Sequence, residues 1–595
     1  MCSTISMLQD CKTIVIATVV AALTTHLWLK TCDPVPFWAA AIALLTIPSI
    51  ATFIVNAVIP SSMFSLTLAY PAFYLALTTS ICAYRLSPFH PLAKFPGPII
   101  MRLTKLWGAW VAYQGQAHIY IKQLHDRYGP IIRIGPNELS TVEKELIPQI
   151  LGNQGMPKGP LWDGRRFGNA GNSKGYDTLI DLRDSVLHAE LRGPWNKAFG
   201  AEPMKTYEEL LIRRIVELND RLKKACSRGT AQVDMAKWPS CFTFDLMGDL
   251  AFSGDFRLME NVDKDGRLEM MDKAMFFMSI TQHLPWIAMS VRSLPIINNW
   301  VMKFMNYGIE ISIKRSQMEF KQKDLFYYMG EACGRLGSEF ALIVQNCLLA
   351  IIAGSDTTAS ILSSIVYLLL SHPDKYKKLQ QEVDRFFTEY QIDLDAQQAA
   401  SDVVAGKMYG EVLGRLNYLN GVISEALRLF PAVPTSLQRA PAKGTSSKAL
   451  QLGNTIVILP EGNAISVPPY AVQRDPRYFS PYSEEFVRER WFSSSSSGIK
   501  YVTSRDAFIP FSAGPQNCPG HSFALIEMHY ALAVLVKNFN MEFDTPDYNP
   551  VCQWPKFVVT AKPSAKYQSS PDPSLSCESR SACARQCSIT LLPGG

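Results

Sequence analysis

The first 85 residues carry long apolar runs, whereas polar and charged residues interrupt the rest of the chain. Between Pro34 and Tyr84 there is no Asp, Glu, Lys, Arg or His. The runs VPFWAAAIALLTIPSIATFIVNAVI and SMFSLTLAYPAFYLALTTSICAY are each long enough for a helix that crosses a hydrocarbon core, which takes about 20 residues. A shorter run, TIVIATVVAALTTHLWL, precedes them, and a cleaved signal peptide would explain that run alone. Residues 1–85 are predicted to form a membrane anchor with two or three transmembrane helices.

The pattern changes after the anchor. The stretch RLSPFHPLAKFPGP contains four prolines, so residues 86–99 are predicted to be a stiff connector. From about residue 100 to 430 the apolar spacing is mostly helical, as in EELLIRRIVELNDRLKKA, and short runs of strand type such as LQLGNTIVILP and FVVTAKP come later. We therefore expect a mainly α domain with small β-sheets over residues 100–563. The serine- and cysteine-containing segment 564–595 is predicted to be a disordered tail.

Charge and cysteine usage narrow the function. The net charge of +6 is spread over 58 basic and 52 acidic residues without a basic block, so nucleic acid is not an expected partner. The 13 cysteines form no CxxC pair, which argues against zinc sites and a disulfide framework and favours a cytosolic domain. With three membrane helices, Lys30, Arg85, Lys94 and Arg102 share one side, which the positive-inside tendency makes cytosolic.

One cysteine, Cys518, lies in a stiff turn directly before an apolar helix, in the stretch FIPFSAGPQNCPGHSFALIEMHYALAVLV. Glycines on both sides allow the backbone to approach a flat cofactor, and backbone amides that point at the sulfur stabilise a thiolate. The helix that opens near His521 directs its positive end towards the sulfur, and Phe511 supplies an apolar cover. The alternative is a glycine- and proline-rich turn around an inert buried cysteine.

This turn resembles the heme-binding loop of the cytochrome P-450 superfamily, in which Phe, Gly, Cys and Gly recur at fixed spacing. Phe511, Gly514, Cys518 and Gly520 match that pattern. The resemblance implies that heme b is bound here, with the Cys518 thiolate as the axial ligand of the iron.

Two positions of the loop depart from the family pattern. Gln516 replaces an arginine that usually pairs with a heme propionate. Pro519 has no N–H, which removes one possible hydrogen bond to the sulfur. We hypothesise that the less stabilised thiolate donates more electron density to the iron and lowers its reduction potential.

A second motif, AGSDTTAS, lies in a strongly apolar helical stretch. Gly354 costs about 1 kcal/mol relative to alanine in a helix, and Asp356 is unfavourable there unless it is paired. The motif resembles the oxygen-activating helix of the family, which implies that Gly354 opens a groove beside the iron. The same resemblance makes Asp356 and Thr357 the acid and alcohol that relay protons to dioxygen. The alternative is a helix whose Asp and Thr face water.

A third motif places Glu425 and Arg428 three residues apart in ISEALRLFP. The family has a Glu-x-x-Arg helix that binds an arginine in a later segment, here FVRERW with Arg490. Arg488 stands where the family usually has proline. The implied role is structural support of the heme loop, and the alternative is an ordinary solvated salt bridge.

The fourth motif, LHAELRGPWNKAF, sets His188 and Arg192 one helical turn apart. Related heme-thiolate proteins hold heme propionates with residues at this spacing in an early helix, so the resemblance implies that role for both, in partial compensation for Gln516. The alternative is a His and Arg pair on a helix surface. The four motifs occur in the order found in the family, and the resemblance covers about residues 86–563.

The resemblance implies a fungal, membrane-bound heme-thiolate monooxygenase that hydroxylates or otherwise oxidises a hydrophobic small molecule. Terpenoids, aromatic compounds, other secondary metabolites and xenobiotics are all possible substrates. Electrons are expected from an NADPH-dependent flavoprotein reductase on the same membrane, because the chain has no flavin or nicotinamide fingerprint. The expected location is the endoplasmic reticulum membrane, with the catalytic domain in the cytosol.

Segments expected to line the substrate pocket are largely uncharged. By resemblance they are residues 163–176, MFFMSITQHLPWIAMSV, Ile352 with Ala353, and PAVPTSLQ. Two other functions stay open at this point. One is a heme-thiolate isomerase that rearranges peroxides without dioxygen or reductase, against which Asp356 and Thr357 argue. The other is a membrane-bound heme-binding protein without catalysis, which Gln516 keeps open.

Overall fold

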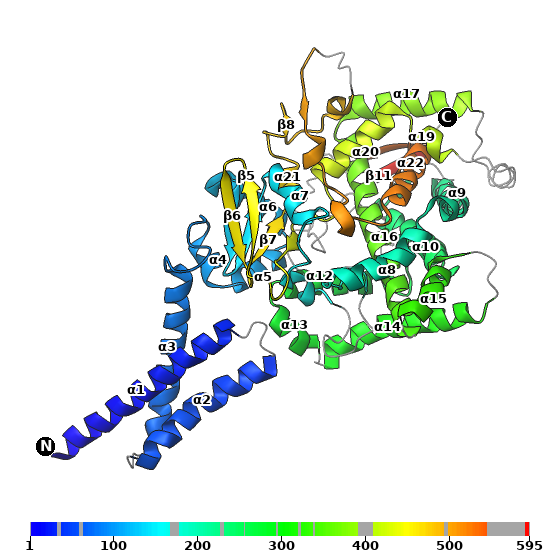
Figure 1. The fold of residues 1–595 in the computed structure, drawn as a ribbon. Coiled ribbons are helices and arrows are strands. Elements are labelled where there is room, and N and C mark those ends of the chain that lie inside the picture. The colour runs from blue at the N-terminus through cyan, green and yellow to red at the C-terminus, as the bar shows by residue number, and fades with distance from the viewer. Residues whose placement is uncertain are drawn as a thin grey trace, which may run out of the picture.

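The computed structural model describes most of the chain (Figure 1). The described residues are 2–31, 37–58, 64–166, 178–226, 231–254, 256–292, 295–318, 323–336, 340–390, 409–492, 498–543 and 589–593.

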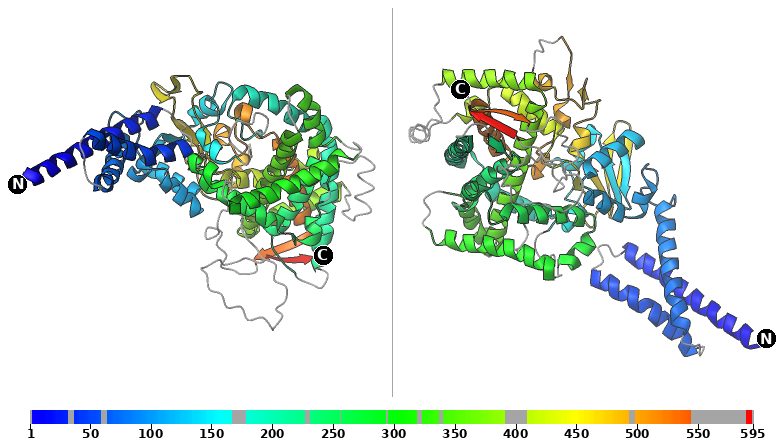
Figure 2. Two further views of the ribbon diagram at one scale, coloured as in Figure 1. Left: turned by 90° about the horizontal axis from the view of Figure 1, so that it is seen from below. Right: turned by 180° about the vertical axis from the view of Figure 1, so that it is seen from behind.

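Three N-terminal helices form a bundle that projects from the main body, with the N-terminus at its far end (Figures 1 and 2). They are α1 (Cys2–Thr31), α2 (Phe37–Val58) and α3 (Phe64–Leu86). All three are long and apolar enough to cross a membrane, and only 17–22% of their most apolar windows is buried. Helix α16 (Phe340–Leu370) also meets the length and composition criteria, but 61% of it is buried inside the protein. Helices α1–α3 are therefore candidate membrane spans, whereas α16 is a core helix.

The anchor meets the body at two places. After α3, the connector folds into turns and buries Leu92 and Phe95 against the sheet region, so it is more than an extended spacer. The Arg133 guanidinium donates hydrogen bonds to the carbonyl oxygens of Arg85 and Pro136, which fixes the end of α3 to strand β1 (Ile131–Gly135). Separately, α2 contacts α13 (Pro285–Arg292) of the body.

A four-stranded sheet lies on the side of the body nearest the anchor (Figure 1). Its order is β1 (Ile131–Gly135), β2 (Glu138–Thr141), β7 (Ala464–Val467) and β4 (Leu437–Arg439), with β2 and β7 parallel and the other pairs antiparallel. The predicted run LQLGNTIVILP forms a hairpin of β5 (Ser447–Leu452) and β6 (Thr455–Pro460), because Gly453 and Asn454 make a two-residue turn. Short elements surround these strands. They are α4 (Ile99–Leu103), α5 (Leu106–Tyr113), α6 (Ala117–Tyr128), η1 (Lys144–Leu146), α7 (Ile147–Leu151), η2 (Pro160–Gly164), α21 (Pro469–Val472), β8 (Phe479–Ser480), β9 (Val502–Thr503) and η5 (Arg505–Ala507).

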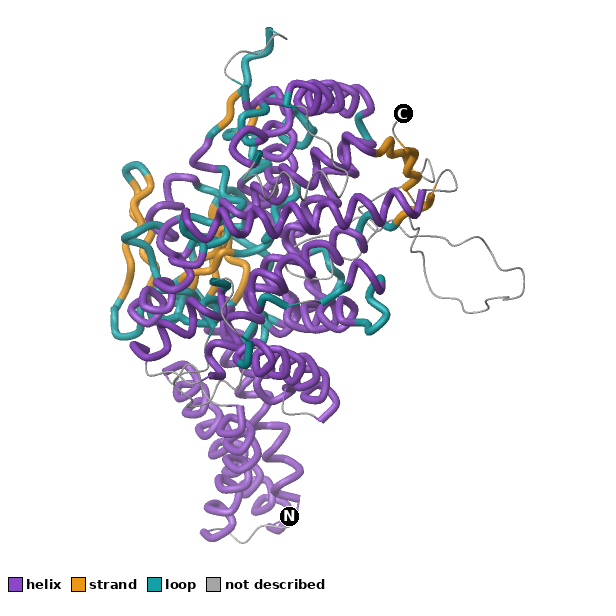
Figure 3. Tube along the Cα trace, turned by 90° about the vertical axis from the view of Figure 1, so that its right-hand side faces the viewer, coloured by secondary structure: helices purple, strands orange, loops and turns teal. Residues whose placement is uncertain are grey.

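Helices make up the rest of the body, as Figure 3 shows, which confirms the expectation of a mainly α domain with small sheets. Helix α16 is central because most of its residues are apolar and buried, and it packs along α10 (Lys237–Phe252). The others are α8 (Ser185–Ala198), α9 (Ala201–Ala225), α11 (Leu258–Asn261), α12 (Arg267–Thr281), α14 (Pro295–Ser316), α15 (Leu325–Leu336), α17 (Pro373–Glu389), α19 (Gly410–Leu413), α20 (Asn417–Leu429), η4 (Arg488–Trp491), η6 (Gly514–Gln516) and α22 (His521–Asn538).

The C-terminal segment differs in part from the expected disordered tail. Residues 589–593 form β11 (Ile589–Pro593), which pairs with β10 (Phe539–Phe543) and β3 (Ala231–Val233). These five residues are thus a strand, whereas residues 564–588, the run FVVTAKP and the loop Ser493–Ser497 lie outside the described residues.

Candidate functional site

The Cys518 loop is a closed turn between η6 and α22. The Cys518 amide donates a hydrogen bond to the Phe511 carbonyl oxygen at 3.0 Å, and the Phe511 ring packs against His521, with 4.3 Å between ring centroids. Gly514 has a φ of +72°, and a Cβ there would lie 2.1 Å from the Leu151 carbonyl oxygen of α7. Glycine is therefore required at position 514 by the conformation and by the close approach of α7.

The surroundings of the Cys518 sulfur act on its pKa in opposite directions. Burial raises the pKa of the thiol, while a hydrogen bond from the Gly520 backbone N–H and the positive charge of Arg192 lower it. Pro519 has no N–H to donate to the sulfur, and the backbone hydrogen bond there comes from the Gly520 amide. The net effect is a raised pKa, and a thiolate here needs a further positive partner, as a bound metal ion provides.

Helix α8 carries the predicted pair His188 and Arg192. The carboxylate of Asp184 caps this helix by accepting hydrogen bonds from the amides of residues 186 and 187. Arg192 donates to the carbonyl oxygen of Asn517 at 2.6 Å and to its side-chain oxygen at 2.8 Å. Arg192 thus holds the backbone beside Cys518, a contact that the sequence did not predict, and its role toward a heme propionate stays a prediction. His188 is 4% exposed, and burial together with nearby cations lowers its pKa to about 3, so it is neutral at physiological pH.

Two basic residues that the sequence reasoning missed complete a basic cluster, defined as Lys158, His188, Arg192 and Arg439. Lys158 and Arg439 are paired through an isolated β-bridge, and each is at most 5% exposed. Burial first, and the charge of Arg439 second, lower the pKa of Lys158 to about 7, although Asp181 opposes the shift. Burial lowers the pKa of Arg439 to about 10. The only sequence signal was the presence of charged residues in the otherwise uncharged stretches GMPKGPLW and TSLQRAP.

The basic cluster and the loop together fit heme. Buried cations that repel one another need anions, and the two propionates of heme b supply them. A Cβ at Gly520 would make only an ordinary contact, 3.6 Å from Phe199, so the protein packing does not itself require this glycine. Space for a flat group beside the loop does explain it. Gln516, at the position of the usual arginine, has a buried Oε1 without a hydrogen-bond partner among the described residues.

The AGSDTTAS motif lies in the middle of α16, where the helix presents one accessible face. Ala353 is exposed although the residues on either side along this helix are largely buried, which indicates open space over this point of the core. The Thr357 hydroxyl on the same face donates to the Ala353 carbonyl oxygen at 2.6 Å, and Asp356 is 6% exposed. The structure places the missing side chain of Gly354 against α10, because a Cβ there would lie 2.5 Å from Met247 Sδ. Gly354 thus permits the close packing of α10 on α16.

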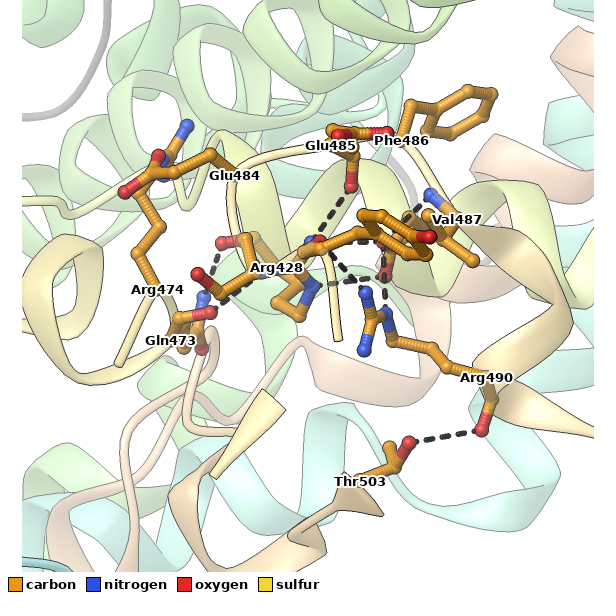
Figure 4. A network of polar contacts seen from close by, with 12 residues as sticks. Arg428, Gln473, Arg474, Glu484, Glu485, Phe486, Val487, Arg490 and Thr503 are labelled. Carbon is orange, nitrogen blue, oxygen red and sulfur yellow. Dashed lines mark hydrogen bonds and ion pairs between the residues drawn. The ribbon is translucent and has the colours of Figure 1, made fainter. Parts of the chain in front are cut away.

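The predicted triad of Glu425, Arg428 and Arg490 comes together in a fully buried network (Figure 4). Arg428 forms a bidentate pair with Glu425 at 2.8 and 2.9 Å, and Arg490 donates to the same carboxylate at 3.1 Å. The Val487 amide and the Trp491 indole also donate to Glu425, each at 2.9 Å. The carboxylate therefore has its charge and its lone pairs satisfied.

Gln473 connects this network to the cysteine loop and was missed by the sequence reasoning. Arg428 donates to the Gln473 carbonyl oxygen at 2.8 Å, and the Gln473 side-chain amide donates back to the Arg428 carbonyl oxygen at 2.9 Å. The Gln473 side-chain oxygen accepts from the Ile509 amide at 2.9 Å, two residues before Phe511.

Arg488, at the position of the usual proline, stacks on Tyr418 with 3.3 Å from its guanidinium carbon to the ring centroid.

Comparisons with known proteins agree with the fold and the site. A family model described as Cytochrome P450 matches residues 96–568, so the chain belongs to the cytochrome P450 family. Cytochrome P450 67 of Uromyces fabae is 30% identical over 489 residues, which cover 80% of this chain and 84% of that protein. Cytochrome P450 monooxygenase FCK2 of Fusarium pseudograminearum is 29% identical over 485 residues, 80% of each chain. Tryprostatin B 6-hydroxylase of Aspergillus fumigatus is 28% identical over 484 residues, again 80% of each.

Proposed function

We propose that this protein is a membrane-anchored heme-thiolate monooxygenase that oxidises a hydrophobic small molecule. The substrate is either a metabolite of fungal secondary metabolism or a xenobiotic. The observation that carries the proposal is the closed Cys518 loop, which Arg192 of the basic cluster contacts through Asn517. Relatives named as monooxygenases, one of them a hydroxylase of tryprostatin B, support the reaction class.

Each part of the site has a separate task in this proposal. Cys518 holds the iron, and the Arg192 contacts to Asn517 keep the loop in place. Lys158 and Arg439 hold the propionates, with neutral His188 beside them. Heme bound through a thiolate supplies the activation of dioxygen for insertion into a C–H bond.

Proton handling falls to α16. The Thr357 hydroxyl donates to the Ala353 carbonyl oxygen, and the lone pairs of its own oxygen can accept a further hydrogen bond. Thr357 can therefore take a proton on its oxygen and release its own proton to dioxygen. Asp356 precedes it on the same turn and is the carboxylate that can resupply this hydroxyl. The Glu425 network does not touch this face and supports the loop through Gln473.

Electrons are proposed to come from an NADPH-dependent flavoprotein reductase. The apolar helices α1–α3 support anchoring in a membrane, proposed to be that of the endoplasmic reticulum. The basic residues that flank them support a cytosolic catalytic domain.

The first test is the carbon monoxide difference spectrum of the full-length, dithionite-reduced protein beside a Cys518→Ser variant. We expect a strongly red-shifted Soret band that the variant loses. An unshifted band, or one that is unaffected by the substitution, would contradict thiolate ligation by Cys518. Oxygen consumption that depends on NADPH and reductase, and that falls in Asp356→Asn, then separates a monooxygenase from a peroxide-rearranging enzyme and from a heme-binding protein without catalysis.

A further inference from the structure

Arg165, which follows η2, is a buried cation that the proposed mechanism does not use. It is 8% exposed, and burial lowers the pKa of its guanidinium to about 9. Its Nε donates to the Gln282 side-chain oxygen at 2.8 Å, and its guanidinium carbon lies 4.4 Å from the centroid of the Trp162 ring. A guanidinium has five N–H donors, and within the described part of the chain this is its one hydrogen bond. Nη2 is buried without a partner there.

The carboxylates around Arg165 are already bound to other groups. Asp163 pairs with Arg183 at 2.5 Å, and Glu138 pairs with Lys105 at 2.6 Å. The Asp181 carboxylate accepts from the Thr178 hydroxyl at 2.6 Å. Among the described residues, therefore, no carboxylate forms an ion pair with Arg165. Burial of an unneutralised charge costs several kcal/mol, so a protein rarely retains one without a ligand for it.

The segments that hold Arg165 lie next to the basic cluster. Gln282 directly follows α12 and accepts the hydrogen bond from Arg165. The Trp162 indole donates to the Gln438 carbonyl oxygen of β4, the strand that carries Arg439. The Thr281 hydroxyl donates to the Gly164 carbonyl oxygen at 2.9 Å, which joins the end of α12 to the segment of Arg165. Arg165 thus lies between the end of α12 and the Trp162 contact with β4, close to the basic cluster.

We propose that Arg165 binds a carboxylate group of the substrate, so that the substrate is a hydrophobic small molecule that carries an acid. This rests on the proposed function and adds a charge to a pocket that the sequence predicted to be largely uncharged. The heme propionates offer the same chemistry, and both Arg165 and Lys158 of the basic cluster lie against the Trp162 ring, at 4.4 and 5.5 Å from its centroid. In the proposed function, Lys158 and Arg439 already provide one cation for each of the two propionates.

The test compares each acid with its primary amide on the same carbon skeleton. The probes are decanoate, 4-phenylbutanoate and indole-3-acetate, with binding to the full-length heme-loaded protein measured by equilibrium dialysis at pH 7.5. We expect at least one acid to bind about tenfold more tightly than its amide, as a hydrogen-bonded charge pair allows. Arg165→Gln should bring that ratio close to one, and Arg165→Lys should retain part of it.

The adjacent arginine provides the matched control. Arg166 lies 3.6 Å from Asp163 and donates to the Asp181 carbonyl oxygen, so Arg166→Gln should leave the ratio unchanged. Arg165→Gln should not lower the melting temperature, because it removes a buried charge that lacks an ionic partner. A loss of stability with an unchanged ratio would indicate a structural role and overturn the proposal. Equal affinity for every acid and amide in the wild type would overturn it as well.

Heme content separates the remaining outcomes. Arg165→Gln should keep the heme content and the red-shifted carbon monoxide band of the wild type. If heme is lost and the ratio is kept, the arginine binds a propionate and the proposal is wrong. A preparation without that band in the wild type would contradict the proposed function itself, whereas a normal band with no preference for acids contradicts only the role of Arg165.

Discussion

The Glu425 network and the basic cluster are both buried, yet they treat charge in opposite ways. Glu425 is bound by two arginines, an indole and a backbone amide, and the pairing is complete within the protein. Lys158 and Arg439 are cations placed close together, and each has its pKa lowered by burial. A buried charge that is neutralised by other groups of the protein therefore has a structural role, whereas a buried charge without a counter-charge indicates a ligand-binding site.

The largest effect should come from removing charge from the complete network. Glu425→Gln leaves Arg428 and Arg490 buried without a carboxylate, so we expect a loss of about 3–5 kcal/mol in the free energy of unfolding. Chemical denaturation, followed by fluorescence, measures it. The control is Glu411→Gln, in an exposed pair with Arg415, which should cost less than about 0.5 kcal/mol. Similar losses in both variants would break the distinction.

Removing a charge from the basic cluster should affect the ligand more than the fold. Arg439→Met should leave the heme-free protein at least as stable as wild type, since its charge is unneutralised there. We expect heme to dissociate at least about tenfold faster, because a charge-assisted hydrogen bond is lost. Transfer of heme to an excess of apomyoglobin measures that rate. An unchanged rate, together with a large loss of stability, would place Arg439 with the Glu425 network instead.

The contribution of Lys158 to stability should depend on pH. Its folded pKa, about 7, lies below the unfolded value of about 10.4, so the unfolded chain binds more protons between these values. The contribution of Lys158 to the stability of the heme-free protein should therefore rise as the pH increases from 7 to 10. Denaturation midpoints at several pH values measure this rise, which Lys158→Met should lack. A wild-type protein and a variant with parallel pH profiles would show that Lys158 does not titrate in this way.

The smallest effect concerns the Cys518 sulfur, which accepts a backbone hydrogen bond from Gly520. Pro519→Ile restores a backbone N–H beside Cys518, and a further hydrogen bond of about 1 kcal/mol should stabilise the thiolate. The reduction potential of the bound iron should rise by roughly 40 mV, since 59 mV corresponds to a tenfold change for one electron. Spectroelectrochemical titration measures it, with Pro515→Ala as a control in the same loop. An unchanged potential would contradict the hypothesis about Pro519.

Sequence reasoning succeeded where the information is local. The cysteine loop and the Glu-x-x-Arg helix are short motifs with fixed spacing, and the apolar runs of α1–α3 need only length and composition. Lys158 and Arg439 were missed because a β-bridge between distant segments places them together. Gln473 was missed for the same reason, since its partners lie on α20 and before Phe511.

The same limit applies to residues whose expected roles stay predictions and whose contacts in the fold the sequence did not predict. Gly354 was expected to open a groove beside the iron, and its α10 neighbour, Met247, is far away in sequence. Arg192 was expected to bind a propionate, and its contact with Asn517 depends on how α8 approaches the loop. A short motif therefore identifies a residue more reliably than it identifies the residues, distant in sequence, that contact it in the fold.

The two places where the anchor meets the body have a mechanical consequence. A domain tethered by a single stem can swivel about it, whereas attachment through both the α3 connector and the contact between α2 and α13 removes that rotation. With α1–α3 in a membrane, as proposed, the segment that follows α12 would keep a fixed depth and orientation relative to the bilayer. Molecules that leave the lipid would then always meet the same face of the body.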